Sequence, residues 1–375
     1  MKNLLLLLIV SLTLFSCGEN KILKLENNNV LEIVDSISID PMFGVSSNTA
    51  FDLNGESYFS VANFKTQKEV RIYNSSGELV KTFDLTPFMD FPESIMAYEV
   101  LDLNQILVLI YRDYRVYFLN DKGRITKSIS FKKKLDELGG ISVIRNLSPS
   151  FLLPNSNKIY LSLVKYANFS KIASSTKEVA LEENKKNYLT PRIIYIEDIQ
   201  SDEPVVKSVL SDPYRGVNEY SDLLFRTNHF IYSNNRYMVS LDYSNRFNVF
   251  DSEFNKIATH TVESDYTKIG YQPPNITNIN ELNDIVKESE ATCSLIKRVY
   301  NDPKTGNFII LLHNEDSATA EKELPNVIVY DSAWEKLGEI NLDKHEVMDA
   351  IQSGNKLYIK RQNKNIYDVF ECVEN

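Results

Sequence analysis

Residues Val70 to Phe83 read V-R-I-Y-N-S-S-G-E-L-V-K-T-F and have the pattern of a β-hairpin. Val70, Ile72 and Tyr73 favour a half-buried pleated strand. Asn74 offers a side-chain acceptor at the start of the turn, and Gly77 is free to take a positive φ at its end. We therefore predict two antiparallel strands joined by a short turn.

The same pattern returns further along the chain. Val116 to Ile129 read V-Y-F-L-N-D-K-G-R-I-T-K-S-I, in which Asn120 and Gly123 match Asn74 and Gly77. A related turn follows twice more, as D-S-E-F-N-K from position 251 and D-S-A-W-E-K from position 331. Phe254 and Trp334 hold the same place in it, so we expect a large aromatic side chain to fill the same corner twice.

The β-type runs group into six units of four strands, which predicts an all-β fold, a six-bladed β-propeller of antiparallel blades. The last group has only three strands. The unpaired strand Leu31 to Ile39, whose Leu31, Ile33, Ile37 and Ile39 are expected on one face, would complete it and close the ring. The alternative is a pair of β-sandwich domains divided near Asn187. The hairpin pattern recurs on both sides of that division, which favours the propeller.

Two stretches stand outside the strand pattern. Lys132 to Gly140 is expected to form a short helix or a loop. Ile279 to Ala291 carries apolar residues at helical spacing and is predicted to be a helix.

The N-terminus has the pattern of an export signal. A basic Lys2 precedes an apolar run from Leu4 to Val10, and Leu14-Phe15-Ser16-Cys17 is similar to the lipobox of bacterial lipoproteins. We expect residues 1–16 to be a signal peptide, Cys17 to carry lipid, residues 17–29 to be a polar tether, and residues 30–375 to form the propeller. The alternative is an ordinary cleaved signal with a fortuitous cysteine.

The composition narrows the function classes. A net charge of −10 argues against nucleic acid and against electrostatic docking onto anionic lipid, so acyl chains would have to hold the membrane. Besides Cys17, only Cys293 and Cys372 remain. They allow one disulfide bridge, although two separate core residues are the simpler interpretation.

Several features together are similar to the six-bladed β-propeller lipoproteins of Bacteroidota, a domain-of-unknown-function family related in shape to TolB and NHL-type propellers. They are the lipobox, the strands rich in tyrosine and asparagine, the hairpins ending in G-x-[LI]-x-K-[TS], and the segment K-R-V-Y-N-D-P-K-T-G-N-F-I-I-L from Lys297 to Leu311. The resemblance covers essentially the whole mature chain. It implies a fold and an envelope location, and it supplies no catalytic residues.

Patterns typical of catalytic sites are missing from the sequence. The glycines form neither nucleotide-binding loop, and no serine lies in G-x-S-x-G, so we predict no cofactor and no catalytic residue. His345-Glu346 begins a zinc-protease-like H-E-x-x, but Asp349 replaces the second histidine and the segment has the pattern of a strand. The histidines His229, His260, His313 and His345 are spread over different repeats, and we predict no metal site.

Two connections are the best candidates for partner binding. Tyr111, Arg112, Tyr114 and Arg115 form a turn within the second repeat, where aromatic and guanidinium groups suit a sugar or a protein. Tyr214 and Arg215 lie in a long connection between repeats. The alternative for both is an ordinary solvated turn, with tyrosines covering the edge of a blade.

These observations lead to one expected function and two alternatives. We expect a lipid-anchored, non-catalytic module of the cell envelope that binds a protein or a glycan. Gly18 in place of aspartate after Cys17 favours the outer membrane and leaves the leaflet open. The first alternative is a propeller hydrolase or lyase acting on a polysaccharide or lactone. The second is a purely structural component of an outer-membrane complex.

Overall fold

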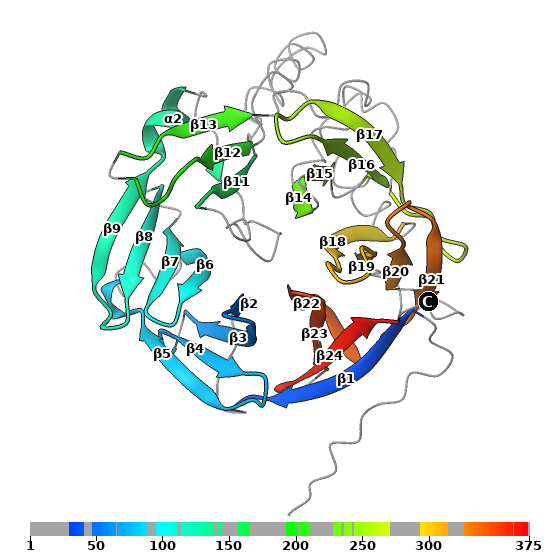
Figure 1. Cartoon of the computed structure of the whole chain (residues 1–375), viewed down its shortest axis with the longest axis horizontal. Helices are drawn as coiled ribbons and strands as arrows, with labels where there is room; N and C mark the ends of the chain where they lie inside the picture. The colour runs from blue at the N-terminus through cyan, green and yellow to red at the C-terminus, as the bar shows by residue number, and fades with distance from the viewer. Residues whose placement is uncertain are drawn as a thin grey trace, which may run out of the picture.

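The computed structural model describes residues 30–40, 47–64, 66–88, 95–110, 114–137, 142–143, 157–164, 193–201, 203–209, 228–233, 236–241, 244–270, 293–313, 326–362 and 364–373. Their strands form six antiparallel sheets of four strands each. Figure 1 shows these sheets arranged as blades around a central axis. The predicted six-bladed β-propeller is confirmed.

Each blade has its first strand at the axis and its last at the rim (Figure 1). Blade 1 contains β2 (Ser47–Leu53), β3 (Glu56–Asn63), β4 (Glu69–Asn74) and β5 (Leu79–Asp84). Blade 2 contains β6 (Ile95–Asp102), β7 (Gln105–Ile110), β8 (Arg115–Asn120) and β9 (Ile125–Ser130). Blade 3 contains β10 (Ser142–Val143), β11 (Ile159–Val164), β12 (Ile193–Ile196) and β13 (Val206–Val209).

The second half of the ring repeats this order. Blade 4 contains β14 (Asn228–Ser233), β15 (Arg236–Leu241), β16 (Arg246–Phe250) and β17 (Lys256–Thr261). Blade 5 contains β18 (Leu295–Asn301), β19 (Phe308–His313), β20 (Val327–Tyr330) and β21 (Lys336–Ile340). Blade 6 contains β22 (His345–Ser353), β23 (Lys356–Arg361), β24 (Ile366–Cys372) and, at the rim, β1 (Leu31–Ser38).

The ring is closed by the first strand of the chain, as predicted. β1 pairs antiparallel with β24, from Leu31 opposite Cys372 to Ser38 opposite Ile366. The expectation that its apolar residues share one face is wrong, because Val34 is an extra, bulged residue in this strand. The bulge reverses the alternation. Leu31 therefore packs between blades 5 and 6, whereas Ile37 and Ile39 pack between blades 6 and 1.

The repeated turn has the same hydrogen bonds in blades 1, 2, 4 and 5. In blade 1 the Asn74 side-chain oxygen accepts from the backbone N–H groups of Ser76 and Glu78. The fourth residue of the turn has a positive φ each time: Gly77 (79°), Gly123 (69°), Phe254 (64°) and Trp334 (68°). The expectation that Phe254 and Trp334 occupy equivalent corners is confirmed.

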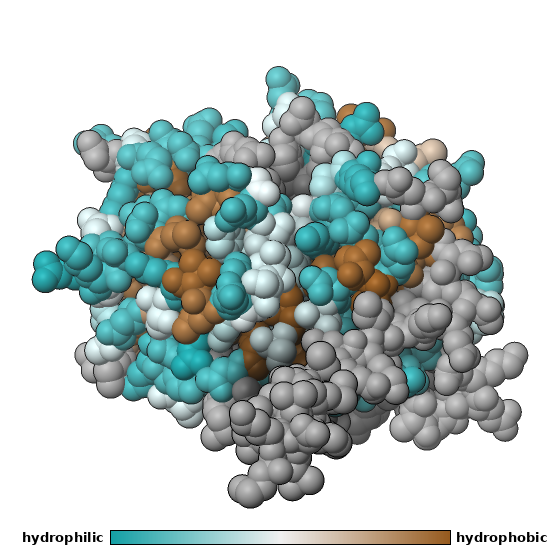
Figure 2. All heavy atoms as spheres, turned by 60° about the horizontal axis from the view of Figure 1, so that its bottom comes forward, coloured by the Kyte–Doolittle hydropathy of each residue, from teal (hydrophilic) through white to brown (hydrophobic). Residues whose placement is uncertain are grey.

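The outer strand after each of these turns carries a bulge. In blade 1, Ile72 pairs with Lys81 and Tyr73 with Leu79, which leaves Val80 as the extra residue. The extra residues in blades 2, 4 and 5 are Thr126, Ile257 and Leu337. A bulge makes a strand edge a poor template for further pairing. On the face shown in Figure 2, which brings the lower edge of Figure 1 forward, hydrophobic side chains lie in separate patches among hydrophilic ones.

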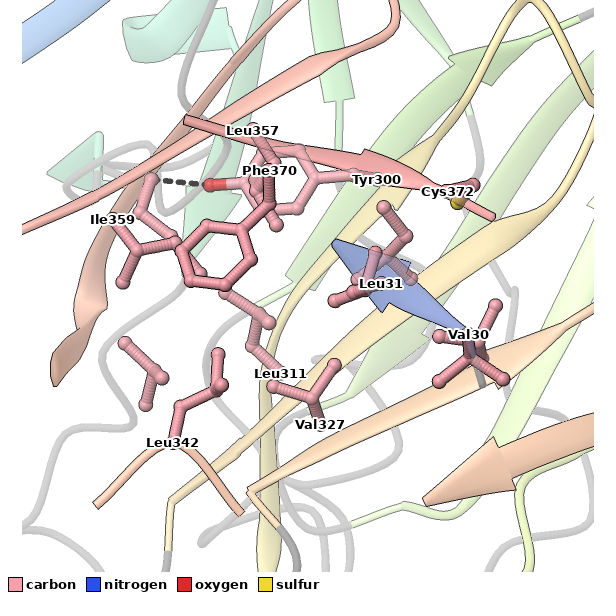
Figure 3. Close-up of a cluster of buried hydrophobic side chains, with 14 residues drawn as sticks. Val30, Leu31, Tyr300, Leu311, Val327, Leu342, Leu357, Ile359, Phe370 and Cys372 are labelled. Carbon is pink, nitrogen blue, oxygen red and sulfur yellow. Dashed lines mark hydrogen bonds between the residues drawn. The ribbon is translucent and has the colours of Figure 1, made fainter. Parts of the chain in front are cut away.

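The hydrophobic core lies between neighbouring blades rather than at the axis. Figure 3 shows the cluster between blades 5 and 6, where Val30 and Leu31 lie close to Leu311 and Val327 of blade 5. Similar clusters join blades 1 and 2, 2 and 3, 4 and 5, and 6 and 1. Burial of apolar area at these contacts is the main stabilising contribution.

Among the described residues, tyrosine hydroxyls add a hydrogen bond at five of the six contacts between blades. Tyr300 donates to the Ala350 carbonyl in blade 6, as the dashed line in Figure 3 marks. The other four pairs are Ser60 with Tyr98 (3.0 Å), Tyr160 with Tyr237 (2.8 Å), Tyr330 with the Glu263 backbone (2.8 Å) and Asn48 with Tyr367 (3.5 Å). At the contact between blades 2 and 3, Lys127 Nζ donates to the Ile199 carbonyl at 2.8 Å.

Some of the remaining predictions concern described residues, and others concern residues outside the described ranges. The stretch expected as a helix or a loop contains α2 (Lys132–Glu137). Cys293 and Cys372 are both buried and do not form a disulfide, in agreement with two separate core residues. No helix in the described part of the chain is long and apolar enough to cross a membrane. The predicted helix Ile279 to Ala291 and the whole N-terminal region 1–29 lie outside the described residues.

Candidate functional site

Three ionisable side chains are buried together at one end of blade 6. His345 begins β22 and is paired with Arg361, which ends β23. Asp368 lies in the neighbouring strand β24 and receives hydrogen bonds from both. His345 Nε2 lies 2.8 Å from Asp368 Oδ2, and Arg361 donates from Nε to Oδ2 at 2.7 Å and from Nη2 to Oδ1 at 2.6 Å.

Strand alternation places the three groups on one face of the blade. Residues two positions away in each strand, Val347, Ile359 and Phe370, belong to the apolar cluster between blades 5 and 6. The His345 ring meets the Phe370 ring edge to face, with centroids 5.3 Å apart. The charged cluster therefore continues the inter-blade core, and it ties β22, β23 and β24 to one another.

The electrostatics favour an ionised carboxylate. Burial alone would raise the pKa of Asp368, but the hydrogen bonds from His345 and Arg361 outweigh burial and lower it below its ordinary value. The same pair raises the pKa of Arg361, chiefly through the hydrogen bond to Asp368. A buried carboxylate with two donors is the arrangement in which a charge is tolerated in a protein interior.

The tautomer of His345 follows from its partner. Because Asp368 accepts at Oδ2, the proton of a neutral His345 lies on Nε2, and Nδ1 presents a lone pair. Nδ1 is buried and has no hydrogen-bond partner within the part of the chain that is described. An imidazole oriented by a carboxylate, with its other nitrogen free, has the composition of a general base.

Burial limits what this group can do. The side chains of His345, Asp368 and Arg361 are 2%, 0% and 11% exposed. A general base must come within hydrogen-bond reach of the proton that it removes, and a substrate does not reach a closed interior. The arrangement is therefore suited first to holding three strands of blade 6 in register.

The structure describes two of the predicted binding residues. Tyr114 has a φ of 51°, and its partly buried ring packs edge to face on Phe131 with centroids 6.1 Å apart. Arg115 donates from Nη1 to Ser128 Oγ at 3.1 Å across the β8–β9 pair. Tyr114 thus covers the edge of blade 2, and Arg115 braces two of its strands.

The other predicted binding residues stay predictions. Tyr111, Arg112, Tyr214 and Arg215 lie outside the described residues. His229 and His260, expected in different repeats, both lie in blade 4, in β14 and β17. Across the described ranges, no group of three or more His, Cys, Asp or Glu side chains is arranged to hold a metal ion.

The sequence held only a partial signal for the His345 cluster. The segment that begins with His345 has the pattern of a strand, but the partners Arg361 and Asp368 lie in other strands and are found only through the pairing register. An arginine and an aspartate at alternating positions with apolar residues were the available signal, since charged residues on a buried face are usually paired.

No protein-family model matches the chain, and no curated protein matches it. Solved structures do resemble it. A streptogramin B lyase has a TM-score of 0.45 at 9% identity over 91% of this chain and 87% of its own. A luciferin-regenerating enzyme has a TM-score of 0.46 at 7% identity over 91% of this chain and 95% of its own.

A much stronger likeness is to a member of the DUF4221 family from Bacteroides vulgatus. Its TM-score is 0.65 at 16% identity, over 92% of this chain and 98% of that chain. At this identity the likeness concerns the fold. The chain therefore shares its fold with a solved Bacteroides protein of a domain-of-unknown-function family, in agreement with the resemblance to Bacteroidota propellers.

Proposed function

We propose that this protein is a lipid-anchored, non-catalytic module of the cell envelope that presents its propeller to a protein or glycan partner. The observation that carries the proposal is the place of β1. The polar stretch after Cys17 leads directly into this strand, which closes the ring by pairing with β24. A lipid on Cys17 would therefore hold the propeller through its closing strand.

The anchor is proposed from the sequence. The apolar run ending at Leu14-Phe15-Ser16-Cys17 is typical of an acylated cysteine, and Gly18 favours the outer membrane. Attachment through acyl chains also suits a protein with a net charge of −10, which anionic lipid headgroups would repel.

The binding role is supported by the rigidity of the ring. Apolar clusters and tyrosine hydrogen bonds fix each blade against the next. Such a scaffold fixes the strand ends from which the connections start, which lowers the ordering cost of recognition. Tyr111, Arg112, Tyr214 and Arg215 remain the proposed contact residues in those connections.

One observation favours a hydrolase or lyase as the second candidate. The His345–Asp368 pair has the chemistry of an oriented base, and its Nδ1 lacks a partner among the described residues. Burial of the ring weighs against it. If this candidate were correct, hydrolysis or elimination of a polysaccharide or lactone would be detected and would be lost in a His345→Gln variant.

The experiment is affinity capture of the lipoprotein from mildly solubilised membranes after brief cross-linking, with a Cys17→Ala form as the unlipidated control. We expect one stoichiometric partner with the native protein, and none with the control. The native protein would also incorporate a labelled fatty acid at Cys17. Recovery of the native protein alone, or equal recovery of partner with the control, would contradict the proposal.

A further inference from the structure

The stretch from Tyr114 to Glu137, which forms β8, β9 and α2, is basic in an otherwise acidic protein. Its acidic residues are Asp121, Asp136 and Glu137. Its basic residues are Arg115, Lys122, Arg124, Lys127, Lys132, Lys133 and Lys134. The stretch therefore has a net charge of +4, whereas the whole chain has −10. Such a local reversal of sign concentrates positive potential on one part of the rim.

Some of these charges are already used within the fold. Lys134 forms an ion pair with Glu137 at 3.2 Å, and Asp121 forms one with Lys81 of blade 1 at 3.5 Å. Lys127 donates to backbone carbonyls of blade 3. Four exposed cations, Lys122, Arg124, Lys132 and Lys133, form no ion pair with any described residue.

The equivalent turns show that the fold does not require these cations. The turn of blade 1 ends in Glu78, that of blade 4 carries Asp251 and Glu253, and that of blade 5 carries Asp331 and Glu335. All four turns have the same backbone hydrogen bonds. Of these four turns, only that of blade 2 contains basic residues, Lys122 and Arg124. The basic charge is therefore a property of this blade rather than of the turn.

Hydroxyl groups lie between the two basic ends. Thr126, Ser128 and Ser130 of β9 are exposed, and Arg115 Nη1 already touches Ser128 Oγ. β9 runs along the outer rim beside α2 (Figure 1). At about 3.3 Å per residue, Arg124 and Lys132 are roughly 25 Å apart along the chain. The result is a linear stripe with cations at both ends and hydroxyls in the middle, which we name the blade 2 stripe.

We propose that the blade 2 stripe binds an anionic polysaccharide, whose carboxylate or sulfate groups pair with Lys122, Arg124, Lys132 and Lys133. The inference rests on the proposed binding function and names the partner class. The bulge at Thr126 makes β9 a poor template for an added peptide strand. A protein partner would also require an aromatic or apolar centre, whereas the stripe offers hydroxyls and one exposed Ile125.

The test measures binding of the detergent-solubilised full lipoprotein to immobilised polygalacturonate and dextran sulfate, with neutral dextran for comparison. We expect binding to at least one polyanion, weakening as salt rises, and none to dextran. Two double variants, Lys122→Gln with Arg124→Gln and Lys132→Gln with Lys133→Gln, should each bind about tenfold or more weakly. Each should reduce the slope of log affinity against log salt by about two.

Lys256→Gln is the matched control, because Lys256 is exposed at the start of the outer strand of blade 4. It should bind like the unaltered protein. If the control lost as much polyanion affinity as the double variants, or if the unaltered protein did not bind a polyanion at low salt, the assignment would be overturned. Vesicles with an anionic lipid form a further arm, and binding there without polysaccharide binding would also overturn it. Capture of a stoichiometric membrane protein alongside a negative polyanion result would reject the stripe while supporting the broader binding function.

Discussion

The imidazole ring of His260 lies against the indole ring of Trp334, with centroids 4.5 Å apart and planes inclined by 22°. His260 belongs to β17 of blade 4, and Trp334 lies in the turn before β21 of blade 5. The indole Nε1 donates to the Thr261 carbonyl at 2.9 Å, and the ring also stacks on Tyr330. This contact explains why a bulky residue accepts a φ of 68°, since the packing offsets the backbone cost.

The first prediction concerns the titration of this stack. Burial, together with the positive charge of Arg236, lowers the pKa of His260 below its ordinary value of 6.5. The unfolded chain takes up the proton first as the pH falls, so this group's contribution to stability is lost as the pH falls through 6.5 towards the lowered folded value. Unfolding by urea at stepped pH should show this loss.

Trp334 gives a direct readout, because it is the only tryptophan in the chain. Protonated imidazole quenches indole emission, so fluorescence of the folded protein should fall with a midpoint below 6.5. His260→Gln should remove that transition while leaving the emission of the unfolded protein unchanged. A midpoint at or above 6.5 would contradict the effect of burial.

The second prediction concerns the tyrosine bonds between blades. Tyr300→Phe removes the donor to the Ala350 carbonyl, although Arg298 Nη1 still donates to that oxygen at 3.2 Å. We therefore expect a loss of about 1 kcal/mol in the free energy of unfolding, measured in urea. Tyr266→Phe is the control, because Tyr266 is 65% exposed and its substitution should change the free energy of unfolding by close to zero. Equal effects of the two substitutions would contradict the role of the bond.

The third prediction separates backbone strain from close packing in the repeated turn. A Cβ at Gly77 would lie 3.2 Å from Ile37 Cγ2 and 3.3 Å from the Ser38 carbonyl of β1, whereas a Cβ at Gly55 would meet nothing within 4 Å. Both glycines have a positive φ, of 79° and 84°. Gly55→Ala should therefore cost about 1 kcal/mol of unfolding free energy from the backbone alone.

Gly77→Ala should cost more than Gly55→Ala, because the new methyl group also presses on the strand that closes the ring. Hydrogen exchange measured on the peptide covering β1 should rise in the Gly77 variant and stay unchanged in the Gly55 variant. If both variants lost the same stability and left β1 equally protected, the close approach of the turn to β1 would have no energetic role.

The fourth prediction concerns the buried thiol of Cys372. Burial, followed by the nearby Asp302 carboxylate, raises the pKa of Cys372 to about 12. The thiolate is the reactive form, so Cys372 should resist iodoacetamide in the folded protein at pH 8 and react after unfolding. Mass spectrometry of the peptide containing residue 372 checks this, and rapid labelling of the folded protein would contradict the buried position.

Recurring local patterns made much of the architecture predictable. Asn74 with Gly77 and Asn120 with Gly123 define the same turn from sequence alone, because side-chain capping and a positive φ are local requirements. The equivalent corners of Phe254 and Trp334 were predictable because the two residues hold the same place in matching turns. The closing role of the Leu31 to Ile39 strand was predictable because a three-stranded last group leaves an edge to cover.

Features that depend on pairing register were not predictable. The bulge at Val34 changes which face of β1 carries Ile37, and nothing in the local sequence requires it. The strand β2 was not delimited, since its polar residues give little alternation. The partners of His345 lie sixteen or more residues away, in strands whose relative register is fixed only by the folded sheet.

The last prediction concerns the charged cluster of blade 6. Asp368→Asn would leave the buried Arg361 without its compensating carboxylate and would weaken the orientation of His345. Removing one partner of a buried ion pair typically costs about 3–5 kcal/mol, so we expect a severe loss of unfolding free energy. Glu346→Gln is the matched control, because Glu346 of β22 pairs with Lys360 of β23 at 2.7 Å in the same blade but remains partly exposed. That substitution should cost at most about 1 kcal/mol.

The cluster also loses stability as the pH falls, but for a different reason from His260. The fold favours the charged form of Asp368, whereas it disfavours the charged form of His260. The folded state lowers the pKa of Asp368, so its contribution is complete above the ordinary aspartate range and is lost as the pH falls through the lowered folded value. The Asp368→Asn variant should therefore lose less stability than the unaltered protein between about pH 5 and pH 3. If the two proteins showed parallel acid unfolding curves over that range, or if Glu346→Gln were as damaging as Asp368→Asn, the cluster would not be what holds blade 6 together.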